Sequence, residues 1–181
     1  MEMFYNAGGH PPVMTEECHC HDHEHEHDHD HEHEHHHEHG EGCCCGAKEL
    51  TPEMLECLKA TGIFALATAD EDGVPNVVPV GMLFPGEDGK IWIVDNFFNK
   101  TLKNLQENPV AAFYIWSPQY QGGCWQIKGR VEILNEGPDY EKAVFFAHSK
   151  MENAPAKHLV KLSVLEVYTV APGPDAGAKV L

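Results

Sequence analysis

Two adjacent residues, Lys100 and Thr101, have side chains suited to holding an anion. They follow Asn99, a good helix N-cap, and Leu102 and Leu105 stand three apart on the short helix that this pattern predicts. The first turn of a helix carries free N–H groups and partial positive charge, so a lysine is misplaced there unless an anion is bound. Backbone donors, an ammonium and a hydroxyl would form a phosphate-sized site. The alternative is a solvated lysine on a surface turn.

A second stretch holds many side chains that bind transition metals. Every second residue from His19 to His35 is a histidine, and residues 19–39 contain twelve histidines and eight carboxylates. Imidazole and thiolate are the ligands preferred by zinc, nickel, copper and cobalt. The candidate ligands are Cys18, His19, Cys20, His21, His23, His25, His27, His29, His31, His33, His35, His36, His37, His39, Cys43, Cys44 and Cys45.

The alternation of this His-rich tail has a geometric consequence. In an extended chain the histidines would fall on one side and the carboxylates on the other, where they would orient the imidazole rings. No spacing matches a zinc finger, so we predict several exchangeable nickel or zinc ions. The alternative is a solvated polyanion that aids solubility.

Charge and cysteine usage restrict the compartment and the partners. Residues 1–46 carry −12 of the net charge of −17, and all twelve basic residues follow them. So acidic a chain is poorly suited to nucleic acid or an anionic membrane. No run of 18 apolar residues occurs, and the first residues lack the pattern of a secretory signal. Seven cysteines, three of them adjacent, do not form a disulfide framework, so we predict a cytoplasmic protein with reduced thiols.

The elements that would position Lys100 and Thr101 follow the tail. A Thr-Pro start and an apolar stripe predict a helix after residue 51, and further helices are predicted at 99–107 and 138–148. Strands are predicted at residues 63–69, 74–84, 90–96, 110–116, 124–134 and 157–170, with a loop at 117–123. Pro75 and Pro79 indicate an edge, a bulge or a bend in the second strand.

This order of elements predicts a mainly β fold. Six strands with short turns, interrupted by a few helices, indicate a small barrel and not a doubly wound sheet. The fifth strand alternates, with Trp125, Ile127, Gly129, Val131 and Ile133 on one face. The predicted organisation is a disordered tail at 1–48, a folded domain at 49–172 and a C-terminal tail at 173–181.

Several weak motifs occur in a recognisable order. They read GIFALATADEDGVPNVVPVGML, GKIWIVDN, NKTLKNLQENPVAAFYI and WQIKGRVEI. In this order the chain resembles the FMN-binding split-barrel family related to pyridoxamine 5′-phosphate oxidase, especially its small flavin-binding members. The resemblance covers residues 50–170 and implies a six-stranded split β-barrel.

The resemblance also implies site residues and a partner. The Lys-Thr pair of the family binds the FMN phosphate, which assigns that role to Lys100 and Thr101 next to Asn99. The family's second strand follows the flavin, which implies Val78, Pro79, Val80 and Gly81, with Asp95 and Asn96 nearby. Its flavin lies at a homodimer interface, so aromatic residues such as Trp116, Tyr120 and Trp125 are candidates for contact from the partner subunit, with core packing as the alternative.

Function remains open among three readings. The first is an FMN-dependent oxidoreductase or electron carrier whose catalytic residues and redox partner are unknown. The second is a metal storage or delivery protein that uses the barrel as a dimeric scaffold, and the third is a barrel that binds deazaflavin or haem. The chain lacks the Arg- and His-containing C-terminal segment with which pyridoxamine phosphate oxidases bind substrate, so vitamin B6 oxidation is not expected. No G-x-G-x-x-G follows a strand, so nothing indicates a Rossmann domain.

Overall fold

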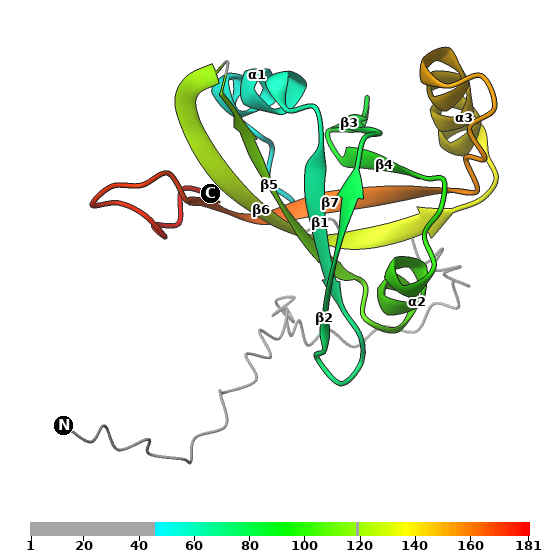
Figure 1. Ribbon diagram of the computed structural model, residues 1–181, viewed down its shortest axis with the longest axis horizontal. Helices are drawn as coiled ribbons and strands as arrows, with labels where there is room; N and C mark the ends of the chain where they lie inside the picture. Colours follow the sequence, from blue (N-terminus) through cyan, green and yellow to red (C-terminus); the bar gives the residue numbers. More distant parts are fainter. Residues whose placement is uncertain (1–45, 119) are drawn as a thin grey trace, which may run out of the picture. The chain divides into compact units, whose positions relative to one another are not determined.

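The computed structural model describes residues 46–118 and 120–181, without the side chains of residues 121 and 122 (Figure 1). The metal ligands predicted between Cys18 and Cys45 lie outside the described residues. No helix in the described part of the chain is long and apolar enough to cross a membrane.

The described residues form three helices and seven strands. In chain order these are α1 (Pro52–Ala60), β1 (Phe64–Ala69), β2 (Pro75–Val80), β3 (Leu83–Pro85), β4 (Ile91–Asp95), α2 (Lys100–Glu107), β5 (Val110–Ser117), β6 (Tyr120–Leu134), α3 (Pro138–Lys150) and β7 (His158–Thr169).

All seven strands belong to one antiparallel sheet of order β2-β1-β5-β6-β7-β4-β3. The long strand β6 curves strongly, so the sheet rolls into an incomplete barrel (Figure 1). This confirms the predicted mainly β split-barrel class. Of the three alternatives that Pro75 and Pro79 indicated, the structure shows the edge position, because β2 is an outer strand of the sheet.

Two strands differ from the sequence expectation. The predicted strand at 74–84 is divided, because β2 pairs with β1 whereas β3 pairs with β4 on the opposite edge of the sheet. The chain changes partners at Gly81, which gives seven strands where six were expected. The loop expected at 117–123 is mostly strand, because pairing of Ser117 with Tyr120 closes a tight β5–β6 hairpin.

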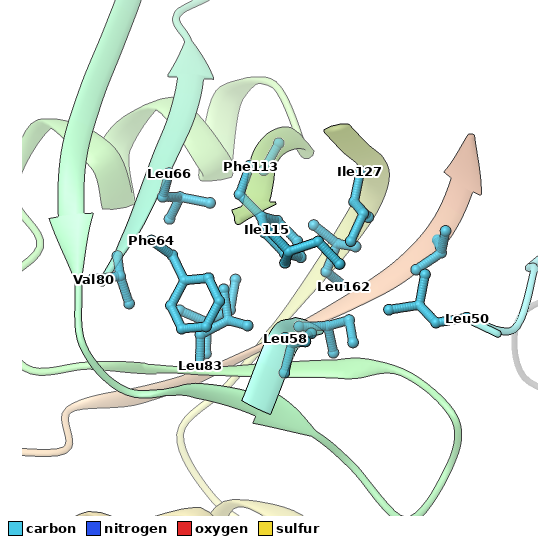
Figure 2. Close-up of a cluster of buried hydrophobic side chains, with 14 of the residues drawn as sticks. Leu50, Leu58, Phe64, Leu66, Val80, Leu83, Phe113, Ile115, Ile127 and Leu162 are labelled. Carbon is cyan, nitrogen blue, oxygen red and sulfur yellow. The ribbon is translucent and has the colours of Figure 1, made fainter. Parts of the chain in front are cut away.

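The core lies inside the curled sheet and beneath α1 (Figure 2). Leu58 of α1 packs with strand residues of which Phe64 and Phe113 meet edge to face, with ring centroids 6.1 Å apart. The predicted inward face of β6 is buried at Trp125 and Ile127, as expected from its alternation. A second cluster forms where α3 packs on β4 and β7.

Gly129 shows why one position of that inward face carries no side chain. A Cβ at this position would lie 2.3 Å from the carbonyl oxygen of Ser163 on β7. The register between β6 and β7 also shifts between Lys128 and Gly129. Glycine therefore permits the close approach that lets the sheet curl at this point.

The C-terminal residues return along the sheet, although the sequence gives no signal for it. The N–H of Val180 donates to the carbonyl of Val167 at 2.8 Å, and Tyr168 forms an isolated bridge with Lys179. Lys179 also contacts the Glu166 carboxylate at 2.8 Å. These bonds hold the end of the chain against β7.

Candidate functional site

A cavity of about 280 Å³ lies where edge strand β2, the end of β4 and the start of α2 meet. Its lining residues are Asn76, Val78, Pro79, Val80, Val94, Asn96, Phe97, Phe98, Asn99, Lys100 and Thr101. Six of them are consecutive, so one stretch of chain forms a whole wall of the cavity.

That wall exists because β4 ends at Asp95 and α2 begins at Lys100, the residue predicted to start the helix. Asn99 occupies the N-cap position, but its side chain makes no capping hydrogen bond. The first intrahelical bond runs from the N–H of Lys103 to the carbonyl of Asn99, at 3.1 Å. The N–H groups before Lys103 therefore have no intrahelical acceptor, and α2 has no acidic residue in its first turn. The helix start is a donor-rich end without an internal counter-charge.

Thr101 is fixed by a polar network beneath the cavity. Its side chain is 2% exposed, and its Oγ1 accepts a hydrogen bond from Asn76 Nδ2 at 3.0 Å. The same amide reaches Thr68 Oγ1 at 3.2 Å, and Asn104 Nδ2 donates to that hydroxyl at 3.2 Å. Because the Thr101 oxygen accepts from Asn76, the hydroxyl keeps its own proton and can donate it to a further acceptor.

Lys100 is exposed at the mouth of the same cavity. No carboxylate lies within ion-pair distance of it among the described residues, whereas Lys103, one turn away, pairs with Glu107 at 3.4 Å. Its ammonium and the N–H groups of the helix start therefore make the local electrostatic potential positive, which favours binding of an anion.

The loop between β4 and α2 is tied to the start of β7. Asn96 accepts a hydrogen bond from the N–H of Ala156 at 3.0 Å through Oδ1, while its Nδ2 lies 3.2 Å from Met82 Sδ. Asp95, which is 0% exposed, accepts from the N–H of Phe98 at 2.7 Å and lies 2.8 Å from His158 Nδ1.

The structure brings most of the ten residues implied for the flavin to this cavity. Val78, Pro79, Val80, Asn96, Asn99, Lys100 and Thr101 all line it. Asp95, Gly81 and Trp116 do not. Asp95 lies buried beneath the loop, and Trp116 is 50% exposed on β5.

Sequence reasoning missed four lining residues, namely Asn76, Val94, Phe97 and Phe98. Asn76 carried a usable signal, because it is a lone amide between two prolines in an otherwise apolar strand. Phe97 is 75% exposed, which is unusual for a large apolar side chain beside a buried strand.

The two cysteines in the described residues have environments that suppress thiolate chemistry. Burial raises the pKa of the Cys57 thiol and also that of Cys124. A thiol with a raised pKa stays protonated at neutral pH and is a poor nucleophile or metal ligand. Cys57 packs in the core, and Cys124 is partly buried on β6.

Known proteins are similar to the part of the chain that forms the sheet and the cavity. The family model described as Pyridoxamine 5′-phosphate oxidase matches residues 50–171. The chain belongs to the pyridoxamine 5′-phosphate oxidase family. The matched range contains every strand of the sheet and the whole cavity, and leaves the His-rich tail outside.

A relative in the same comparison is an uncharacterized protein of Methanocaldococcus jannaschii. It is 36% identical to this chain over 131 residues, which are 71% of this chain and 86% of the relative. The name of this relative carries no activity that could be compared with this chain.

Solved structures repeat the fold. HupZ of Group A Streptococcus superposes with a TM-score of 0.61 at 24% identity, covering 71% of this chain and 99% of HupZ. An FMN-binding protein from Syntrophomonas wolfei gives a TM-score of 0.53 at 21% identity, over 66% and 87% of the two chains. HutZ, the haem storage protein of Vibrio cholerae, gives 0.53 at 14% identity, over 67% and 95%. These likenesses establish the split-barrel architecture of the pyridoxamine 5′-phosphate oxidase family.

Proposed function

We propose that this chain is a flavoprotein that binds FMN by its phosphate at the start of α2. The proposal rests on two adjacent residues, Lys100 and Thr101. Lys100 has no carboxylate partner among the described residues, and Thr101 supplies a buried hydroxyl. Both line one cavity at a helix start whose N–H groups lack intrahelical acceptors. Membership of the family and the likeness to an FMN-binding protein support the choice of ligand.

The donor set fits the phosphate end of FMN. Small-molecule sites commonly enclose about 300–1,000 Å³. A cavity of about 280 Å³ suits a phosphate and its adjoining chain, and leaves the rest of the ligand to extend over β2. Val78, Pro79 and Val80 would supply apolar contact and main-chain groups there.

The division of labour between cofactor and chain follows from these contacts. Bound FMN would supply hydride or one-electron transfer, which makes an oxidoreductase or an electron carrier the proposed role. The chain would anchor the phosphate through Lys100 and Thr101 and shield the ligand with Phe97 and Phe98.

The test is direct. Untagged protein is purified, its absorption spectrum is recorded, and any released ligand is identified by mass spectrometry. We expect FMN, or stoichiometric uptake of added FMN with quenching of its fluorescence. Colourless protein that does not bind added FMN would overturn the proposal, and release of haem or a deazaflavin would replace FMN with that ligand.

Haem is the second ligand to test, because the haem storage protein HutZ shares the fold. A deazaflavin is the third ligand to test, because it is an alternative to FMN for a barrel of this fold. The cavity favours a phosphorylated ligand over haem, because a lysine, a hydroxyl and free N–H groups suit a phosphate.

We propose in addition that a second copy of this chain covers an apolar face of β2, β1 and β5. Val77 pairs with Ala67, and Ala67 pairs with Ala112, so the three lie side by side on this face. Tyr114 extends it along β5 and is exposed. Pro79, two residues beyond Val77 on β2, also lines the cavity, so the apolar face reaches the proposed FMN site.

Light scattering tests this homodimer. We expect wild-type protein to be a dimer and Trp116→Glu, which places a charge beside this face, to be monomeric with weaker FMN binding. Phe145→Glu on α3 is the matched control, because Phe145 is also an exposed aromatic residue but lies on another element. A wild-type monomer at micromolar concentration would overturn the proposal.

The His-rich tail supports a second function, the binding of several nickel or zinc ions. Among the described residues, no group of three or more His, Cys, Asp or Glu is placed to hold a metal ion. We therefore expect full-length protein to bind several ions, and a chain beginning at Ala47 to bind none, by elemental analysis. Binding should weaken as pH falls, because imidazole must be neutral to ligate. Equal metal content in the two chains would contradict this function.

A further inference from the structure

We propose that Asp95 is a positioning residue for the phosphate site. Its buried carboxylate, held by His158, sets the turn that presents Lys100 and Thr101. The proposal rests on the proposed FMN site, and it replaces the expectation that Asp95 itself approaches the flavin.

Each carboxylate oxygen of Asp95 has a polar partner. It is the last residue of β4, and its side chain is 0% exposed. One carboxylate oxygen accepts from the N–H of Phe98 at 2.7 Å, and the other lies 2.8 Å from His158 Nδ1. A buried carboxylate is strongly unfavourable without such donors, so both bonds are needed to keep it in place. A partner on each oxygen restricts the rotation of the carboxylate.

The Phe98 bond acts on the path of the chain toward the cavity. Only residues 96–99 separate β4 from α2, so the direction taken at Phe98 decides where the helix starts. Phe98 packs against the core, whereas Phe97 is largely exposed, and the Asn99 side chain makes no capping bond. Asp95 is therefore the side chain that bonds to the backbone of this short loop at Phe98, two residues before Lys100, while Asn96 ties the start of the loop to Ala156.

His158 fixes Asp95 from the neighbouring strand. The two are register partners in the β4–β7 pair, and the N–H of Lys157 donates to the Asp95 carbonyl at 2.8 Å. Next to them, the N–H of Ala156 donates to Asn96 Oδ1 at 3.0 Å. These bonds hold the loop against the start of β7, and the His158 imidazole is the contact that fixes the Asp95 carboxylate.

A positioning role differs measurably from a purely structural role. Riboflavin has the ring and chain of FMN but no phosphate, so it does not use Lys100 or Thr101. Displacing the helix start should weaken FMN binding and leave riboflavin binding nearly unchanged. A general loss of structure should weaken the binding of both ligands.

The experiment measures FMN and riboflavin dissociation constants by flavin fluorescence for full-length variants. For Asp95→Ala we expect FMN binding to weaken about tenfold or more and riboflavin binding to change by less than about threefold. Asp95→Asn should retain most of the FMN affinity, because an amide can still accept from the Phe98 N–H. His158→Asn should also retain it, since its amide can reach the position of Nδ1, whereas His158→Leu should lose it.

Controls separate this proposal from the FMN proposal. Wild-type protein that binds neither flavin would overturn the FMN site itself. Wild-type protein that prefers FMN, combined with an unchanged FMN-to-riboflavin ratio in Asp95→Ala, would overturn only the positioning role. Circular dichroism checks folding; if Asp95→Ala does not fold, His158→Leu carries the same test. If neither variant folds, the pair serves the fold and not the site, and the proposal fails.

Discussion

Lys100 and Lys161 show two opposite uses of the same side chain in one small domain. Lys161 is 9% exposed, and its ammonium lies 2.7 Å from a carboxylate oxygen of both Asp88 and Asp139. It also lies 5.7 Å from the centroid of the Trp92 ring. Lys100 is exposed at a helix start and has no carboxylate partner within ion-pair distance in the described residues. The charge of Lys161 is neutralised by two carboxylates of the fold, whereas that of Lys100 has no such partner in the described residues, which fits the proposed phosphate site.

The difference teaches how to separate structural from binding lysines. Burial lowers the pKa of Lys161, but hydrogen bonds to Asp139 and Asp88 together outweigh that effect and raise it above the ordinary value. Removing such a lysine should destabilise the folded protein and leave ligand affinity nearly unchanged. Removing Lys100 should weaken ligand binding and leave the stability of the fold nearly unchanged.

The largest effect is expected for Lys161→Met. The substitution leaves Asp88 and Asp139 partly buried without their shared cation, so we expect a loss of about 3 kcal/mol in unfolding free energy. Urea denaturation measures it, and FMN affinity of the folded fraction should stay within about twofold of wild type. A large loss of FMN affinity without a loss of stability would break the contrast.

Lys100→Ala should give the complementary result. Loss of a charge-assisted phosphate contact should weaken FMN binding by about 2 kcal/mol, or about thirtyfold, without changing the urea midpoint. Lys103→Ala is the matched control, because Lys103 lies on the same helix and forms only an exposed pair with Glu107. Equal FMN affinity in Lys100→Ala and Lys103→Ala would mean that the phosphate binds elsewhere.

Thr101→Val should have a smaller effect on the same measurement. The change keeps the shape of the side chain but removes the hydroxyl that accepts from Asn76 and would donate to the phosphate. We expect about 1 kcal/mol of lost FMN affinity, and a stability loss of similar size because the Asn76 amide loses one acceptor. Thr101→Ser, which keeps the hydroxyl, should restore both; failure to do so would rule out the hydrogen bond as the cause.

The smallest effect is a pH dependence at the Lys161 cluster. Burial raises the pKa of Asp88, but hydrogen bonds from Lys161, Trp92 and the Lys90 N–H together lower it below the ordinary value of 3.8. A lowered pKa stabilises the folded state at any pH above that ordinary value, and this contribution disappears as pH falls through the folded-state value. Wild type should therefore lose more stability than Asp88→Asn between pH 5 and pH 2, by urea denaturation. Parallel curves would show that Asp88 contributes nothing.

The same contrast explains what the sequence revealed and what it did not. The start of α2 at Lys100 was identifiable because a helix start is a local pattern, which Asn99 and the leucine spacing indicated. The mainly β fold class was also identifiable from the order of strands and turns. Pro75 and Pro79 indicated the edge position of β2 as one of three alternatives. Each of these features depends on residues that are close together in the chain.

Features that depend on long-range pairing were not identifiable. The division at Gly81 follows from β2 and β3 pairing at opposite edges of the sheet, and no local pattern specifies that choice. The Asp95–His158 contact joins residues 63 positions apart. No local pattern could therefore link His158 to this site, and Asp95 was expected near the flavin although its carboxylate is buried.

The two prolines of β2 have a consequence for self-association. Proline in a sheet is tolerated where its nitrogen faces away from the neighbouring strand, so Pro75 and Pro79 lie with their nitrogens toward the free edge. Of the three alternate positions on that edge, only Val77 keeps an N–H to offer. An additional strand could not form a continuous ladder there, so the strand that lines the cavity is protected from edge-to-edge aggregation while its faces stay open.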